Sequence, residues 1–172
     1  RRADAAPRLA GEIASHLDDL GFHQSVFEAS LEESEEPLPK GCETVDFLFG
    51  PNPGEPAKPL RSIASSGEMS RVMLAVKSAL AEQDRIPLMV FDEIDANVGG
   101  EIAGAVGAKM AFLGTRHQVV AITHMPQVAC KAHHHYLVTK EVDGDATRSG
   151  LEPVEGKARI AELARMLGGR CD

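Results

Sequence analysis

The sequence lacks a phosphate-binding loop of the form G-x-x-x-x-G-K-[ST] anywhere in its 172 residues. Without that loop the chain has no nucleotide phosphate cradle of its own. Cysteine is scarce, because there are only three cysteines and no C-x-x-C pair, which favours reduced thiols over a disulfide framework or a zinc site. No apolar run approaches the roughly 20 residues that span a bilayer, so we expect no membrane partner.

Net positive charge is absent as well. The formal net charge is −8, so the chain does not coat nucleic acid through bulk charge, and a DNA contact requires a local basic patch or another part of the molecule. The length of 172 residues predicts one domain, and 43% hydrophobic residues are ordinary for a soluble globular protein. The chain begins at Arg1 and runs directly into helical sequence, so we expect it to be part of a longer chain.

The N-terminal part of the chain predicts one helix and two strands. An apolar stripe follows one face of residues 3–20, at Leu9, Ile13, Leu17 and Leu20. This helix, which Gly21 ends, is compatible with the last turns of a long arm and equally with an ordinary surface helix. Strands are expected at 22–32 and 44–49, separated by an acidic stretch that prolines interrupt. We expect both strands to pair with something outside the core.

The remainder of the chain alternates apolar strands with helices. Helices are expected at 67–83, 100–113, 126–131 and 157–167, and strands at 87–91, 118–123 and 135–141, with a turn at 143–145. The strand at 87–91 is continuously apolar, which is typical of a sheet that is buried on both faces. The alternation predicts an α/β fold with parallel strands flanked by helices.

Two adjacent carboxylates, Asp92 and Glu93, follow the apolar strand. In parallel α/β sheets, ligands bind beyond the carboxyl ends of the strands. Neighbouring side chains of a strand point to opposite faces, so the two carboxylates can perform different tasks. We expect Asp92 to bind Mg²⁺ through water and Glu93 to polarise the water that attacks the γ-phosphate of ATP. Taken alone, the pair is also compatible with a strand cap.

The turn Ser65-Ser66-Gly67-Glu68 opens the helix that precedes this strand. Backbone N–H groups at the start of a helix bind phosphate, because they lie at the positive end of the helix dipole. The hydroxyls of Ser65 and Ser66 add donors, and Gly67 permits close approach. Ser65 and Glu68 also fit a capping box, which is compatible with phosphate binding in the same turn.

A histidine and an aspartate complete the set of candidate residues. His124 follows the strand at 118–123, where it can hydrogen-bond a γ-phosphate oxygen and the catalytic water. Taken alone, it would favour a loop histidine that is hydrogen-bonded locally. Asp95 lies in the turn at 94–98, and it either reaches across a subunit boundary or caps the helix that follows.

Four segments carry a resemblance to a known family: IASSGEMSR, PLMVFDEIDANVGG, VVAITHMPQVA and HHYLVTK. In this order they resemble the RecN family, bacterial SMC-like ATPases of DNA double-strand-break repair. The likeness runs from about residue 3 to residue 169. Ser66 stands where this family usually has glycine, and Ala96-Asn97 replaces the more usual Thr-Gly.

The resemblance implies a division of the chain and a role for each motif. Residues 21–172 would form the C-terminal lobe of an ABC/SMC-type ATPase head, and 1–20 the root of its coiled-coil arm. The roles implied are the ABC signature for Ser65, Ser66, Gly67 and Glu68, Walker B for Asp92 and Glu93, the D-loop for Asp95, and the switch histidine for His124.

The resemblance also implies partners and a mechanism. An N-terminal P-loop half of the same head would hold ATP, Asp92 of this chain would bind Mg²⁺, and two such heads would sandwich two ATP molecules as a homodimer. We therefore expect an ATPase that is inactive until the P-loop half completes it, and that meets DNA through the complete protein in the bacterial cytoplasm, at the nucleoid. The alternatives are a lobe that dimerises on ATP without hydrolysis, the nucleotide-binding half of an ABC transporter, and a generic α/β binding domain.

Overall fold

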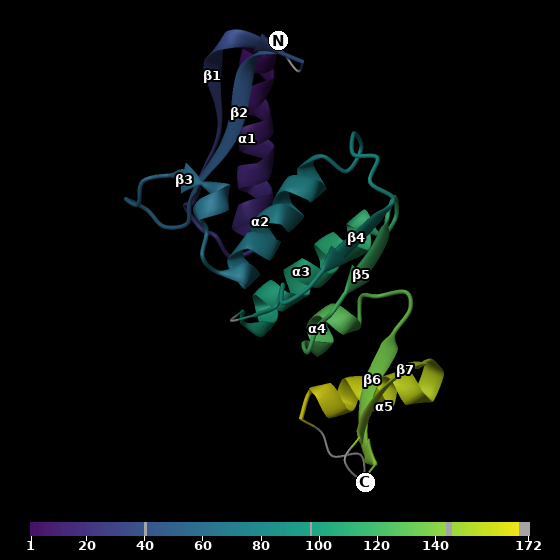
Figure 1. The fold of residues 1–172 in the computed structure, drawn as a ribbon. Helices are drawn as coiled ribbons and strands as arrows, with labels where there is room; N and C mark the ends of the chain where they lie inside the picture. The colour runs from purple at the N-terminus through teal and green to yellow at the C-terminus, as the bar shows by residue number, and fades with distance from the viewer. Residues whose placement is uncertain (40, 97, 144–145, 169–172) are drawn as a thin grey trace.

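The computed structural model describes residues 1–39, 41–96, 98–143 and 146–168 (Figure 1). Asn97 and most of the predicted turn at 143–145 lie outside the described residues. The elements, in chain order, are α1 (Arg2–Asp19), β1 (Val26–Leu38), β2 (Gly41–Gly50), β3 (Lys58–Pro59), a 3₁₀ turn (Leu60–Ser62), α2 (Ser66–Ala79), β4 (Leu88–Phe91), α3 (Gly100–Leu113), β5 (Gln118–Ala121), α4 (Pro126–Ala129), β6 (Tyr136–Asp143), β7 (Ala146–Pro153) and α5 (Gly156–Met166).

Helix α1 ends where the sequence predicts, at Gly21. The N–H of Phe22 donates to the carbonyl oxygen of Leu17 at 3.0 Å, and the N–H of Gly21 donates to that of Asp18 at 3.1 Å. This pair of bonds is a Schellman motif, which requires a left-handed residue after the helix cap. Gly21 has a φ of +86°, and a Cβ atom here would lie 2.5 Å from Cδ1 of Ile102. The turn therefore requires glycine, and a side chain at this position would also displace the end of the Ile102 side chain of α3.

Strands β1 and β2 form an antiparallel hairpin that lies along α1 (Figure 1). The two strands pair with each other from Val26 opposite Gly50 onward, in a sheet separate from β4 and β5, and their pairing with another part of the protein stays a prediction. The acidic stretch after residue 32 does not end the first strand, since β1 continues to Leu38 with a register shift after Glu33. A proline is tolerated there because β1 is an edge strand.

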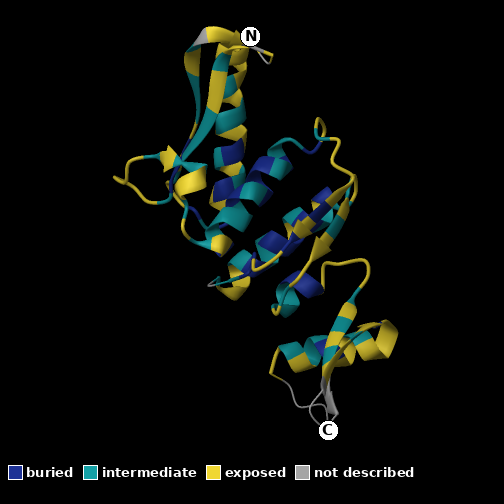
Figure 2. Ribbon diagram, in the orientation of Figure 1, coloured by how far each residue is buried: buried dark blue, intermediate teal, exposed yellow. Residues whose placement is uncertain are grey.

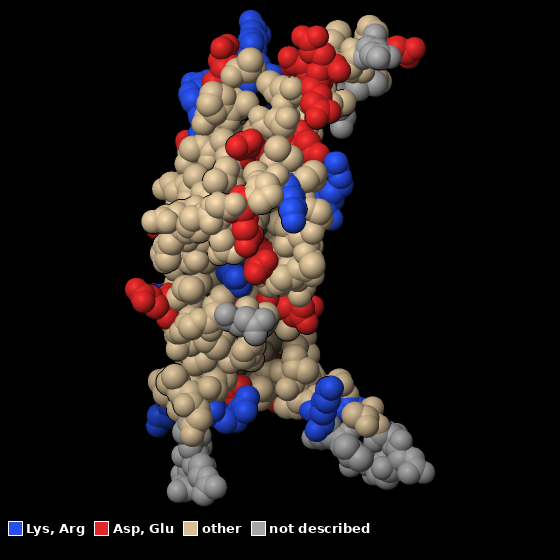
Figure 3. All heavy atoms as spheres, turned by 90° about the vertical axis from the view of Figure 1, so that its left-hand side faces the viewer, with Lys and Arg blue, Asp and Glu red and all other residues tan. Residues whose placement is uncertain are grey.

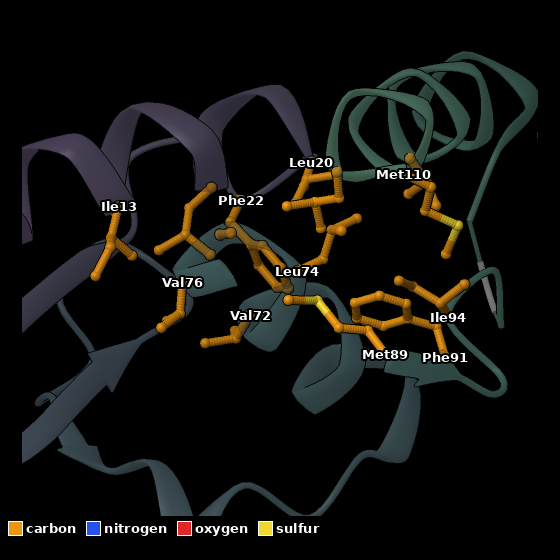
Figure 4. Packing of buried hydrophobic residues seen from close by; sticks show 14 of the residues in the cluster. Ile13, Leu20, Phe22, Val72, Leu74, Val76, Met89, Phe91, Ile94 and Met110 are labelled. Atoms are coloured by element: carbon orange, nitrogen blue, oxygen red, sulfur yellow. The ribbon is translucent and has the colours of Figure 1, made fainter. Parts of the chain in front are cut away.

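The hydrophobic core lies where α1, α2, α3 and β4 meet (Figure 2). Ile13 and Leu20 of the α1 segment point toward Val72 and Leu74 of α2 (Figure 4). Phe91 approaches the same cluster from β4. The apolar stripe of α1 is therefore buried only in its C-terminal half, because the N-terminal half of the helix lies along the hairpin with mostly exposed side chains.

Strands β4 and β5 form a two-stranded parallel sheet, of which the described residues cover one face only. Met89 and Phe91 are buried, whereas Leu88 and Val90 are 49% and 60% exposed. Val120 and Ile122 extend the exposed face at β5. The prediction of a strand buried on both faces is therefore wrong for this chain, because α2 and α3 cover one side of the sheet and none of the described residues covers the other.

The C-terminal segment adds a second hairpin and the last helix. Strand β7, which the sequence did not predict, pairs with β6 so that Leu151 lies opposite Val138. Helix α5 follows this hairpin and contacts α4 through Arg159, whose guanidinium donates to carbonyl oxygens of Ala129 and of the residues that follow α4, the nearest being that of Ala132 at 2.7 Å. Among the helices that the structure describes, none has both the length and the apolar character to cross a membrane.

Candidate active site

The turn that opens α2 is organised by a helix cap. Ser65 is the N-cap residue, and its hydroxyl oxygen accepts a hydrogen bond from the N–H of Glu68 at 3.3 Å, which confirms the N-cap bond of the expected capping box. Gly67 is buried, and a Cβ atom here would lie 3.2 Å from the carbonyl oxygen of Glu93 and 3.1 Å from Cβ of Ala96. The glycine therefore allows the start of α2 to lie directly against the turn after β4.

The chain turns sharply after β4. Asp92 and Glu93 are exposed, whereas Ile94 and Asp95 are buried. Glu93 has a φ of 54°, in the left-handed region, and its carbonyl oxygen accepts a hydrogen bond from the N–H of Ala96 at 3.0 Å. Non-glycine residues seldom adopt this conformation, and such residues are frequent at functional sites. The turn leaves both carboxylates accessible at the carboxyl end of β4.

Three side chains of α2 donate hydrogen bonds to this turn. They are Ser66 to Oε2 of Glu93 at 2.6 Å, Ser70 to the carbonyl oxygen of Asp92 at 3.2 Å, and Arg71 to the carbonyl oxygen of Ala96 at 3.3 Å. The segments that the sequence suggested as separate motifs are therefore one structural unit. Sequence reasoning missed Ser70 and Arg71, whose only signal is that helical spacing brings them to the same side as Ser66 and Gly67.

Arg71 connects the turn to the base of α1. Its guanidinium carbon lies 5.0 Å from the centroid of the Phe22 ring, which is within the range of a cation–π interaction. Phe22 in turn meets Phe49 of β2 edge to face, with ring centroids 5.2 Å apart. Burial lowers the pKa of Arg71, against the opposing effect of the Glu68 carboxylate. The contacts make a continuous path from the first hairpin to the turn after β4.

Asp95 holds the segment that contains His124. Its side chain is only 2% exposed, and its Oδ2 accepts hydrogen bonds from the hydroxyl of Thr123, from the N–H of His124 at 3.1 Å and from that of Met125 at 3.2 Å. The His124 ring is 74% exposed, with Nδ1 3.5 Å from the same carboxylate oxygen. The alternative that Asp95 caps α3 is wrong, because Gly99 is the N-cap residue and no side chain caps that helix.

These contacts bring the sequence-predicted residues to one edge of the parallel sheet. Glu93 and His124 both follow strands whose carboxyl ends meet there, and Ser66 reaches the same turn from α2. Across the described ranges, no group of three or more His, Cys, Asp or Glu side chains is placed to hold a metal ion. Asp92 is exposed, so its carboxylate is accessible to an ion such as Mg²⁺, which takes few carboxylates and keeps its other positions for water and phosphate oxygens.

The fold is similar to solved structures of SMC heads. A structure from work on ATP-driven dimerisation and DNA-stimulated activation of SMC ATPases shares 18% identity and a TM-score of 0.57, with 94% of this chain and 92% of that one covered. The Smc head domain of Pyrococcus yayanosii with a coiled coil and joint shares 18% identity and a TM-score of 0.64, with 91% of this chain and 28% of that one covered. The chain therefore has the α/β fold of an SMC-type ATPase head.

Sequence similarity identifies the family within this class. The DNA repair protein RecN of Xylella fastidiosa is 45% identical over 171 residues, which cover 98% of this chain and 30% of that protein. RecN of Streptomyces coelicolor is 40% identical over 183 residues, which cover 99% of this chain and 32% of that protein. No family profile matches the chain. The chain belongs to the RecN family as a C-terminal part and spans about 30% of the length of these relatives.

Proposed function

We propose that this chain is the C-terminal lobe of the ATPase head of a DNA-repair protein, and that it supports ATP hydrolysis once a P-loop half completes it. The observation that carries the proposal is the meeting of α2, the turn after β4 and the His124 segment at one sheet edge. The relatives are DNA repair proteins, and the chain is too short to account for their whole activity.

In the proposed reaction, each accessible side chain has its own task. Asp92 binds Mg²⁺ through water, and Glu93 accepts a proton from the water that attacks the γ-phosphate. His124 donates a hydrogen bond to a γ-phosphate oxygen. Bound ATP and Mg²⁺ supply the phosphoryl group and neutralise its charge, whereas this lobe orients the water and the phosphate.

The partner proposed for completion is the N-terminal P-loop half of the same head. The uncovered face of the β4–β5 sheet supports this proposal, because Val90 and Ile122 are 60% and 59% exposed although their type favours burial. The surface lies at the sheet whose carboxyl edge carries Glu93 and His124. A P-loop half that docks against it would bring a bound nucleotide close to both residues.

A second head is the proposed partner of residues 65–68, which form the ABC signature in this assignment. The side chain of Ser66 is exposed and can meet the ATP of an opposite head. Asp95 is assigned to the D-loop, and its carboxylate accepts hydrogen bonds from the Thr123–Met125 segment of the same lobe. In the complete protein, α1 is the root of a coiled-coil arm.

DNA contact is assigned to the complete protein, acting in the cytoplasm at the nucleoid. On the face shown in Figure 3, basic and acidic side chains are interspersed, and acidic ones gather near the end that carries the first hairpin. Such a distribution on a chain of net charge −8 does not favour DNA binding by this surface alone.

Mixing the two halves tests the proposal. The chain alone is expected to show no ATP hydrolysis, because it lacks a P-loop. Addition of the separately produced P-loop half is expected to restore turnover, measured as phosphate release. Turnover by the chain alone would contradict the proposal. Association with ATP but without hydrolysis would instead favour the alternative of a lobe that only dimerises.

A substitution on the exposed face of the β4–β5 sheet tests where the P-loop half docks. Val90→Lys places a charge on the proposed docking surface, and we expect the mixed halves to lose most of their turnover. The free energy of unfolding of the chain should change by less than about 1 kcal/mol, because the side chain is exposed. Full turnover by the mixture with Val90→Lys would show that the P-loop half docks elsewhere.

A further inference from the structure

The hydroxyl of Ser66 and the carboxylate of Glu93 form a short hydrogen bond, with 2.6 Å between Oγ and Oε2. Hydroxyl-to-carboxylate bonds of this length are charge-assisted and stronger than bonds between neutral groups. The bond joins the residue assigned to phosphate contact in an opposite head to the residue assigned as general base. The two belong to motifs 27 positions apart.

The backbone around both residues is held by other contacts. The carbonyl oxygen of Glu93 accepts the N–H of Ala96 at 3.0 Å, and Gly67 lies against the same carbonyl. Ser70 donates to the neighbouring carbonyl oxygen of Asp92 at 3.2 Å. Because the backbone is fixed in this way, the hydrogen bond from the Ser66 hydroxyl determines the orientation of the Glu93 carboxylate.

A serine hydroxyl carries one proton and can donate only one strong hydrogen bond at a time. Ser66 therefore cannot donate to Glu93 and to a phosphate oxygen together. Both side chains are exposed, so a nucleotide on an opposite head can reach the hydroxyl. The phosphate of an opposite head and the Glu93 carboxylate therefore compete for the same hydroxyl proton.

We propose that Ser66 is a positioning residue that holds the Glu93 carboxylate in an idle orientation until the phosphate of an opposite head takes over its hydroxyl. This inference rests on the proposed function, because it assumes that residues 65–68 meet ATP in trans. Its consequence is that the general base becomes available only in an engaged pair of heads.

A double-mutant cycle in the complete protein tests the inference. The dissociation constant of the two heads is measured with a non-hydrolysable ATP analogue, so that hydrolysis does not affect the result. The variants are Ser66→Ala, Glu93→Gln and the double substitution. Glu93→Gln weakens the acceptor, so we expect tighter head association, by about fivefold, while Ser66 is present. With alanine at position 66, the same substitution should change association by less than about twofold.

Two further cycles provide matched controls. Ser66→Thr keeps a hydroxyl and should retain the fivefold response to Glu93→Gln, which a loss of packing alone would not reproduce. Ser70 lies one turn along α2 and donates to a backbone carbonyl oxygen rather than to the Glu93 side chain. The effect of Ser70→Ala should therefore be additive with that of Glu93→Gln.

The outcomes distinguish a failure of the Ser66 proposal from a failure of the proposed function. Equal responses to Glu93→Gln with serine and alanine at position 66 would overturn the idle-orientation proposal and leave the proposed function intact. An absence of analogue-dependent association in the unsubstituted protein would overturn the proposed function itself. A response that requires a hydroxyl at position 66 would support both.

Discussion

At the scale of single residues, Glu93 and Asp95 show how neighbours in sequence acquire different tasks. Glu93 is exposed and hydrogen-bonded to Ser66, whereas Asp95 is buried and accepts three donors from the Thr123–Met125 segment. The difference follows from the sharp turn after β4, because the left-handed conformation of Glu93 redirects the chain inward.

Glu93→Gln in the complete protein is expected to abolish ATP turnover, because an amide cannot accept the proton of the attacking water. ATP-dependent association of the heads should persist, since the amide occupies the same volume. Phosphate release and sedimentation of the heads with ATP measure the two effects. Wild-type turnover in this variant would show that Glu93 is not the general base.

Asp95→Ala is expected to lower the free energy of unfolding by about 2–5 kcal/mol, because three donors around a buried carboxylate lose their acceptor. Asp95→Asn, which keeps one carbonyl acceptor, should cost less. Urea unfolding of both variants measures the difference. An alanine variant as stable as the wild type would mean that water replaces the carboxylate without cost.

At the scale of elements, the close packing of α3 against the backbone of α4 requires glycine at position 107. A Cβ atom at Gly107 would lie 3.0 Å from the carbonyl oxygen of Gln127 and 3.1 Å from Cα of Val128. Gly104, on the same helix, has no neighbouring atom within 4 Å of such a Cβ. The two glycines look alike in the sequence, and only the position of α4 distinguishes them.

Gly107→Ala is therefore expected to destabilise the protein by about 1–3 kcal/mol through overpacking against backbone atoms. Gly104→Ala should instead stabilise it by up to about 1 kcal/mol, because alanine favours the helix and meets no neighbour. The matched pair is compared by denaturant unfolding. Equal effects at both positions would contradict the close packing of α4 on α3.

At the scale of the whole molecule, α1 and α3 are joined by a polar cluster around Lys109. Its ammonium group donates to Nδ1 of His16 at 2.6 Å and to Oδ2 of Asp19 at 2.8 Å. Burial and the nearby Lys109 charge lower the pKa of His16 below its ordinary value of 6.5, against smaller opposing effects of Asp19 and Glu12. The hydrogen bond from Lys109 lowers the pKa of Asp19 as well.

The lowered pKa of His16 predicts a loss of stability in mild acid. Below pH 6.5 the unfolded chain binds a proton at this residue more readily than the folded chain does, so the free energy of unfolding falls until the pH passes the folded pKa. His16→Asn should flatten this dependence in urea unfolding between about pH 7.5 and 5. The exposed His134→Asn is the control, and an equal effect of both would contradict the assignment to His16.

Much of the secondary structure could be predicted from the sequence, and so could the segments that meet at the candidate site, although Ser70 and Arg71 were missed. The bounds of α3 agree with the prediction, and α2, β4 and α5 differ from theirs by a few residues. Strand β7 was missed because its residues, including Arg148, Ser149 and Gly150, show no clear apolar alternation. Its pairing with β6 overrides that weak local preference.

The sequence by itself determined the order of the motifs, the absence of a P-loop and the resemblance to RecN, because these are properties of residue identity and spacing. Only the tertiary structure decided that one face of the parallel sheet is uncovered, that Asp95 holds the His124 segment, and that Ser66 bonds Glu93. Periodicity reports which side of an element is apolar. It does not report which distant element lies against that side, and hydrogen bonds between segments depend on that arrangement.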